Sequence, residues 1–251
     1  EAECRRIAAY AADCGIGLKT LATGCYGAVN LGAADEEERA RAVEFTKKYL
    51  KIASWIGAET ILVVPGSAQV TWDPSRPVVP YKTVWDNSTK SLKELLPLAE
   101  ELGVNIALEN VWMRFLLSPM EWKLFLDQFD SPRIGMYLDV GNCLLYAPAE
   151  DYIDLLGAKY IKAVHVKNWK GDDCGGTLHG FGDSLLEGDV NFKAVFAALK
   201  NCGYNRTFTA EMIPFSRLPD LVLPDQALSE KTAAELRALD SGYGDAAVMI
   251  P

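Results

Sequence analysis

The sequence predicts an α/β protein in which helices alternate with the strands of a parallel sheet that forms a TIM (β/α)8 barrel. Short apolar runs, each preceded by a helical pattern, have the composition of strands buried in a parallel sheet. This alternation of strand and helix continues along the chain. The length of 251 residues also matches the ~250 residues of one such barrel. We therefore expect a single domain over residues 1–251.

Helices are expected where apolar residues recur at helical spacing and end signals flank the run. The first such helix ends at Gly15, and the second begins after Asp35, a favourable N-cap whose acidic successors suit the helix dipole. Ser118 and Pro119 suit the start of a later helix. The expected helices cover residues 2–14, 36–57, 83–102, 117–129, 149–157, 191–202 and 225–239.

Strands are expected where short runs are rich in β-branched, aliphatic and aromatic residues. The expected strands cover residues 17–24, 59–66, 105–109, 134–139, 161–165 and 206–211. These are six strands, and a helix precedes the first. An eight-stranded barrel would need a further β–α–β stretch of roughly 40–50 residues. We therefore expect a barrel that lacks its first β–α–β segment in this chain, with a C-terminal tail over residues 215–251.

Two connections are longer than the fold needs. The Pro-rich loop 67–81 is either part of a substrate lid or a passive surface loop. The second loop, 167–188, is rich in glycine. Near its end, Glu187 is expected to cap helix 191–202 rather than to close over a site.

Composition excludes several classes of protein. Hydrophobic residues make up 49% of the chain, which is enough for one large core, and the net charge is −9. This charge disfavours a nucleic-acid partner and fits a cytoplasmic enzyme. The six cysteines form no C-x-x-C pair, so reduced thiols are expected. We find neither a signal peptide nor an apolar stretch long enough for a membrane span.

Four expected strands end on residues that can bind a divalent metal: Glu109, Asp139, His165 and Glu211. The C-terminal ends of barrel strands open on one face, so these side chains can converge. A single carboxylate at a strand end is more often a helix N-cap or a surface residue. Four in successive strand–helix units, including one of only two histidines, favour a metal site. Such a set suits Mn²⁺, Mg²⁺ or Co²⁺ better than structural zinc.

Several phrases of the sequence resemble one enzyme group. They are SLKELLPLAEELGVNIALENVWMRFLLSPMEW, IGMYLDVGN, IKAVHVKN, LLEGDVNFKAVFAALKNCGY and FTAEM, within residues 17–213. The chain resembles the sugar-phosphate isomerases and epimerases among the xylose-isomerase-like TIM barrels, above all the ketose 3-epimerases and L-ribulose-5-phosphate 3-epimerases. The ordered set Glu, Asp, His and Glu is the specific part of this likeness.

The resemblance implies one divalent metal, Mn²⁺ above all, with Co²⁺ or Mg²⁺ as alternatives, bound by Glu109, Asp139, His165 and Glu211. It also implies that Glu109 and Glu211 are the catalytic acid/base pair. Removing a proton next to a ketone needs a base and stabilisation of an enediolate, which a metal supplies as a Lewis acid. Two carboxylates on opposite faces would allow 3-epimerisation of a ketose, whereas isomerisation could use one base.

The chain departs from the free-ketose 3-epimerases at three positions that hold the sugar in that group. Asn142 stands in place of a histidine, Phe115 in place of a second glutamate and Gly171 in place of an arginine. Asn142 can still hydrogen-bond to a hydroxyl or a carbonyl of the substrate. The metal ligands of that group are therefore matched better in this chain than its sugar-binding residues are.

Two further residues are candidates for substrate binding. Trp112 either lines the pocket or packs in the core. Lys167 offers positive charge, for example to a phosphate, although most lysines are solvent-exposed and have no such role. The expected partner is a small sugar or sugar phosphate, and the family likeness implies a homo-oligomer, either a dimer or a tetramer.

Other functions on the same scaffold are considered. A related metal-dependent dehydratase or lyase acting on a keto-sugar or cyclitol would replace reprotonation by elimination, and an inactive binding protein would keep only the fold. The AP endonucleases of this fold need a trinuclear zinc cluster with many histidines and a basic face. Two histidines and a net charge of −9 exclude that function.

Overall fold

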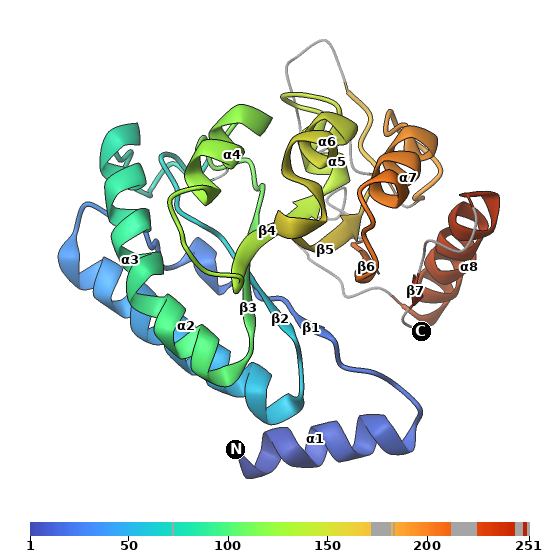
Figure 1. Cartoon of the computed structure of the whole chain (residues 1–251), viewed down its shortest axis with the longest axis horizontal. Coiled ribbons are helices and arrows are strands. Elements are labelled where there is room, and N and C mark those ends of the chain that lie inside the picture. Colours follow the sequence, from blue (N-terminus) through green and yellow to red (C-terminus); the bar gives the residue numbers. More distant parts are fainter. Residues whose placement is uncertain (72, 172–181, 183, 212–224, 244–247, 250–251) are drawn as a thin grey trace. The chain divides into compact units, whose positions relative to one another are not determined.

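The structure is a computed structural model, shown in Figure 1. It describes residues 1–71, 73–171, 182, 184–211, 225–243 and 248–249. These residues pack into two compact units. The first unit contains residues 1–117 and 121–137, and the second contains residues 118–120 and 138–251.

The first unit is built from parallel strands and the helices that connect them. Its strands are β1 (Thr20–Leu21), β2 (Thr60–Val63), β3 (Asn105–Glu109) and most of β4 (Ile134–Asp139). Its helices are α1 (Ala2–Asp13), the 3₁₀ turn η1 (Cys25–Gly27), α2 (Glu36–Ile56), α3 (Tyr81–Leu102) and most of α4 (Pro119–Leu126). Each strand pairs in parallel with the next, and Glu109 lies opposite Tyr137 in the register of β3 and β4. Every residue of β2, β3 and β4 is buried, as in a sheet covered on both faces.

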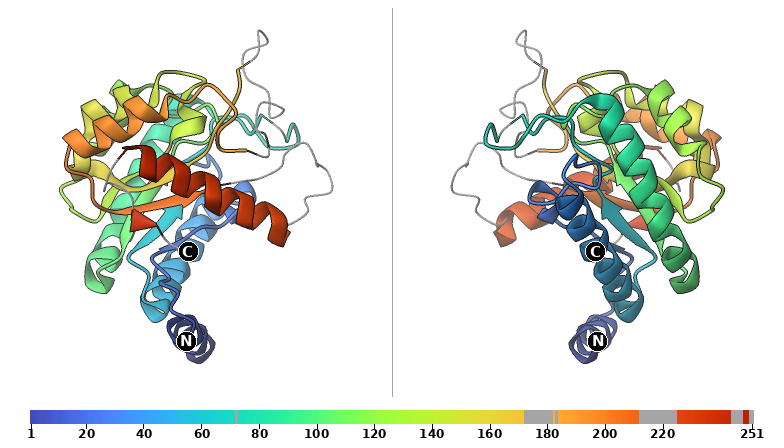
Figure 2. Two further views of the ribbon diagram at one scale, coloured as in Figure 1. Left: turned by 90° about the vertical axis from the view of Figure 1, so that its right-hand side faces the viewer. Right: turned by 90° about the vertical axis from the view of Figure 1, so that its left-hand side faces the viewer.

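The long helices of the first unit begin and end as the sequence predicts. The side chain of Asp35 accepts a hydrogen bond of 2.7 Å from the backbone N–H of Glu38 and so caps α2. Gly57 ends α2 with a φ of 85°, and Gly103 ends α3 with a φ of 68°, both in the left-handed region that favours glycine. Helices α2 and α3 pack against each other, and α1 packs against α2 (Figure 2).

The second unit continues the same alternation of strand and helix. Its strands are β5 (Ile161–Val166), β6 (Thr207–Ala210) and β7 (Val248–Met249), which pair in parallel in that order. Its helices are α5 (Val140–Cys143), α6 (Ala149–Tyr160), α7 (Phe192–Asn201) and α8 (Gln226–Tyr243). Helix α7 packs against both α6 and α8 (Figure 1). Within each unit the described strands pair in sequence order and in parallel, as they do in a (β/α) barrel.

The structure contains all six expected strands and corrects four details. The first strand is only two residues long, and β7 lies near the end of the tail, beyond the expected helix, where no strand was expected. The short helix α5 was not expected, because Val140–Cys143 is too short for a helical period to be visible. The assignment of Glu187 as a cap is wrong, since the side chain of Asn191 accepts the capping hydrogen bond from the N–H of Ala194.

Parts of three expected segments lie outside the described residues, and the first is residue 72 of the Pro-rich loop. The others are residues 172–181 and 183 of the Gly-rich loop, and residues 215–224, 244–247 and 250–251 of the tail. None of the described helices combines the length and the apolar character needed to cross a lipid bilayer.

Candidate metal centre

The ends of β4, β5 and β6 bring three of the expected ligands together in the second unit. Asp139 is the last residue of β4, His165 lies on β5 and Glu211 directly follows β6. The register pairs Val166 with Ala210, and the N–H of Glu211 donates a hydrogen bond of 3.1 Å to the carbonyl of Val166. The parallel pairing therefore fixes Glu211 beside the end of β5.

Asp139 is both a helix cap and a member of this cluster. Its Oδ1 atom accepts a hydrogen bond of 2.8 Å from the N–H of Asn142 at the start of α5. Its Oδ2 atom lies 3.9 Å from Nδ1 of His165 and 3.3 Å from Nζ of Lys167. The Asp139 side chain is fully buried. The cap therefore fixes one oxygen and leaves the other facing the imidazole.

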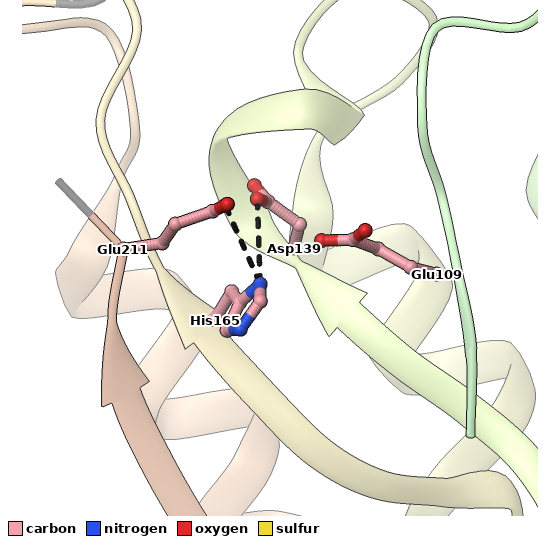
Figure 3. Close-up of side chains that lie close together, drawn as sticks. All are labelled: Glu109, Asp139, His165 and Glu211. Atoms are coloured by element: carbon pink, nitrogen blue, oxygen red, sulfur yellow. Dashed lines mark ion pairs between the residues drawn. The ribbon is translucent and has the colours of Figure 1, made fainter. Parts of the chain in front are cut away.

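The imidazole of His165 faces the carboxylates of both Asp139 and Glu211 (Figure 3). Its Nδ1 atom is 3.4 Å from Oε2 of Glu211, and the ring is buried. Figure 3 shows Glu109, at the end of β3, drawn with these three residues. Asp139, His165 and Glu211 each offer one ligand atom within 4.8 Å of those of the other two. Of the four residues drawn, Glu109, Asp139 and His165 are buried, and Glu211 is partly buried.

The donor set and its spacing fit one divalent ion. Ligands at ~2.1 Å from an octahedral ion lie about 3.0 Å apart when adjacent and about 4.2 Å apart when opposite. The distances of 3.4 and 3.9 Å from His165 to Glu211 and Asp139 fall in this range. Two carboxylates with one imidazole suit a hard, oxygen-preferring ion more than a structural zinc site.

Lys167 is part of this cluster, contrary to the usual exposure of lysine. Its side chain is only 7% exposed, and Nζ donates a hydrogen bond of 2.7 Å to Oε2 of Glu211. A signal for this was present in the sequence. Residues 165 and 167 are two apart in an extended segment, so their side chains project to the same face. Lys170, by contrast, is exposed.

The charges of this cluster act on Glu211. Burial raises the pKa of the Glu211 carboxyl, but the ammonium of Lys167 and the hydrogen bond and charge of His165 outweigh burial. Together they hold the pKa of Glu211 well below its ordinary value. Glu211 is therefore ionised at neutral pH, which is the form that a metal ligand or a base requires.

This depressed pKa predicts a pH dependence of stability in the metal-free protein. Ionised Glu211 stabilises the folded state above the pKa of an unfolded glutamate, about 4.3. That contribution is lost as the pH falls through the lower, folded-state pKa. Urea unfolding between pH 7 and pH 3 should therefore show a steeper acid loss for wild type than for Glu211→Gln. The exposed variant Glu101→Gln should keep the wild-type slope, and equal slopes in all three proteins would contradict the prediction.

The loop after Glu109 is held in a strained conformation. Arg114 and Leu116 have φ angles of 52° and 54°, a region that bulky residues seldom adopt. The hydroxyl of Tyr81 accepts a hydrogen bond from the N–H of Leu116 and donates one of 2.7 Å to Glu121. Strain of this kind is retained where the surrounding structure fixes it, often near functional sites.

Phe115 is a core residue. The resemblance described above implies a glutamate at this position in the free-ketose 3-epimerases. Phe115 is 3% exposed, and its ring lies 5.1 Å from that of Tyr81 and 5.7 Å from that of Phe125. Trp112 is also buried in the first unit, while Asn142 is buried in the second. Burial alone leaves the substrate-binding roles of Trp112, Asn142 and Lys167 as predictions.

Asn168 is a residue whose role sequence reasoning missed. Its Nδ2 atom donates a hydrogen bond of 2.8 Å to the carbonyl of Leu185, and its Oδ1 atom accepts one from the N–H of Val190. Gly188 packs so closely that a Cβ there would lie 2.1 Å from Oδ1 of Asn168. Asn168 thus fastens residues 184–190 to the end of β5, beside the cluster.

Comparison with known proteins places this site in a family. The model of the xylose isomerase-like TIM barrel family matches residues 1–239. The chain belongs to this family. The expected fold class is thereby confirmed, and the resemblance noted in the sequence is correct.

The individual relatives share only a modest fraction of their residues with this chain. The chain is 27% identical over 208 residues to the putative L-ribulose-5-phosphate 3-epimerase SgbU of Escherichia coli, covering 80% of this chain and 68% of SgbU. It is 25% identical over 189 residues to the uncharacterized protein MJ1311 of Methanocaldococcus jannaschii, covering 73% of this chain and 60% of MJ1311. A solved structure of an L-ribulose 3-epimerase superposes with a TM-score of 0.76 at 20% identity, covering 96% and 80% of the two chains. The chain thus spans about two thirds of the length of these curated relatives.

Proposed function

We propose that this protein is a metal-dependent epimerase that inverts C3 of a ketose or ketose phosphate. The observation that carries the proposal is the cluster of Asp139, His165 and Glu211 at successive strand ends. Glu109, at the end of β3, is proposed as the fourth ligand. The names of the relatives agree, since SgbU is a putative L-ribulose-5-phosphate 3-epimerase and UlaE of Salmonella paratyphi C is named an L-ribulose-5-phosphate 3-epimerase.

In this proposal Glu109, Asp139, His165 and Glu211 hold one divalent ion, with Mn²⁺ as the first candidate. When bound, the ion would polarise the ketone oxygen of the sugar as a Lewis acid. Asp139 and His165 are more deeply buried than Glu211, and in this proposal they serve only to hold the ion. Their rigid placement by β4, β5 and the cap of α5 suits that role.

The two glutamates exchange the proton on C3. One carboxylate removes the proton from one face of the sugar, and the conjugate acid of the other returns a proton to the opposite face. Glu211 starts ionised, because the charge of Lys167 and the hydrogen bond and charge of His165 depress its pKa. Asn142 and Trp112 are proposed to contact the sugar, Asn142 by a hydrogen bond and Trp112 by packing.

Proton exchange with solvent tests this function directly. L-ribulose 5-phosphate and L-ribulose are incubated in D₂O with the Mn²⁺-loaded protein and followed by NMR. We expect deuterium at C3 together with a new epimer of otherwise unchanged composition. Chelation by EDTA should remove at least nine tenths of the rate, and Mn²⁺ should restore it.

The products separate this function from the alternatives. Loss of water or of a leaving group would indicate dehydratase or lyase chemistry, in which elimination replaces reprotonation. Neither exchange nor a product with any tested ketose, in a protein that still binds Mn²⁺, would favour a binding protein on the same fold. An unchanged rate after complete removal of metal would refute the metal-dependent scheme.

A further inference from the structure

The second unit keeps two ligand carboxylates close together beside a built-in cation. Asp139 is fully buried and Glu211 is 22% exposed, so little water reaches either charge. Two carboxylates in such a place need a countercharge. Lys167 supplies one, with Nζ at 2.7 Å from Glu211 and 3.3 Å from Asp139.

Lys167 engages the same oxygens that face the imidazole. Oε2 of Glu211 is the atom nearest both Nζ of Lys167 and Nδ1 of His165, and Oδ2 of Asp139 likewise faces both groups. The three protons of an ammonium suffice to contact both carboxylates. A divalent cation ligated by these oxygens would lie close to the ammonium and be repelled by it.

We propose that Lys167 is a resident counter-cation of the metal site. It holds Asp139 and Glu211 in ligand geometry when no metal is bound, and it weakens divalent-metal binding by competing for the same two oxygens. Lys167 is therefore a positioning residue that acts through the ligands. This inference rests on the metal site of the proposed function.

The opposite role makes a different prediction. A lysine that only orients the carboxylates for the ion would strengthen metal binding, and its removal would lower the affinity. A lysine that serves only to bind a substrate phosphate would leave the affinity for metal unchanged. The direction of the change in affinity therefore separates the three roles.

The strand that ends just before Lys167 contains a matched control. Lys162 lies on β5, and as a whole residue it is 5% exposed, the same fraction as Lys167, but its Nζ donates a hydrogen bond of 2.8 Å to the carbonyl of Lys159. Five residues of extended chain, about 16 Å, separate the two lysines. Lys162→Met therefore removes a buried ammonium of β5 at a distance from the ligands.

The experiment measures Mn²⁺ binding by calorimetry and thermal unfolding of the metal-free protein for wild type, Lys167→Met, Lys167→Gln and Lys162→Met. We expect both Lys167 variants to bind Mn²⁺ at least tenfold more tightly and to unfold at a lower temperature without metal. Adding saturating Mn²⁺ should raise their midpoints by more than it raises that of wild type. Lys162→Met should keep the wild-type affinity.

Two results would overturn the inference. An equal or weaker affinity for Mn²⁺ in Lys167→Met or Lys167→Gln, with binding intact in wild type, would refute competition and leave the proposed function standing. No Mn²⁺ binding in wild type or in either variant would remove the metal site itself, and with it both proposals. Lys167→Gln retains a polar group, so its affinity for Mn²⁺ decides the test if Lys167→Met does not fold.

Discussion

Replacing either glutamate of the proposed acid/base pair by glutamine is expected to lower epimerisation by about a thousandfold. Glutamine keeps the size and one carbonyl oxygen of the side chain but cannot accept the proton. Initial rates with L-ribulose 5-phosphate at saturating Mn²⁺ measure the loss for Glu109→Gln and Glu211→Gln. Calorimetry on the same samples separates loss of the base from loss of the metal.

The two variants are also expected to differ in which epimer still exchanges its C3 proton with solvent. Each epimer presents its C3 proton to one face only, so one remaining base should still exchange the proton of one epimer with D₂O without inverting it. Glu109→Gln and Glu211→Gln should therefore retain exchange with opposite epimers. The exposed Glu101→Gln serves as the control with wild-type rates. Full turnover in both site variants would rule out the two-base scheme.

The positions of the candidate ligands were predictable because a short-range pattern determines them. A buried strand of five or six residues that ends on a charged residue indicates both the element and the end that carries chemistry, as with Glu109 and Asp139. Sequence reasoning treated a helix cap and a metal ligand as alternatives for such a carboxylate. The two carboxylate oxygens of Asp139 have different roles: one caps α5, and the other faces His165.

Details that depend on the packing of distant segments were not predictable. The spacing of residues 165 and 167 places Lys167 on the face of His165. That β6 brings Glu211 beside Lys167 could not be predicted, because the two residues are far apart in the sequence. The expected cap Glu187 lies five residues before the start of α7, and the N-cap is Asn191, which was expected to lie inside the helix. The pairing of β7 with β6 involves only two residues, too few for a periodic signal.

Truncating Phe125 to alanine is expected to cost about 3–5 kcal/mol of unfolding free energy. Phe125 lies on α4 and is fully buried. Its ring centroid is 4.9 Å from that of Trp85, 5.5 Å from that of Phe129 and 5.7 Å from that of Phe115. These contacts include edge-to-face pairs, which add stability beyond the buried area. Urea unfolding with a constant m-value measures the loss.

The neighbouring residue provides the control for this truncation. Leu124 precedes Phe125 on α4 but is 63% exposed, so Leu124→Ala should change stability by about 0.5 kcal/mol or less. Phe115, a ring partner of Phe125, lies in the strained loop that follows Glu109. We therefore expect Phe125→Ala also to loosen that loop, seen as faster amide exchange at Leu116. A loss no larger than that of Leu124→Ala would mean that the aromatic cluster closes the cavity by repacking and does not fix the loop.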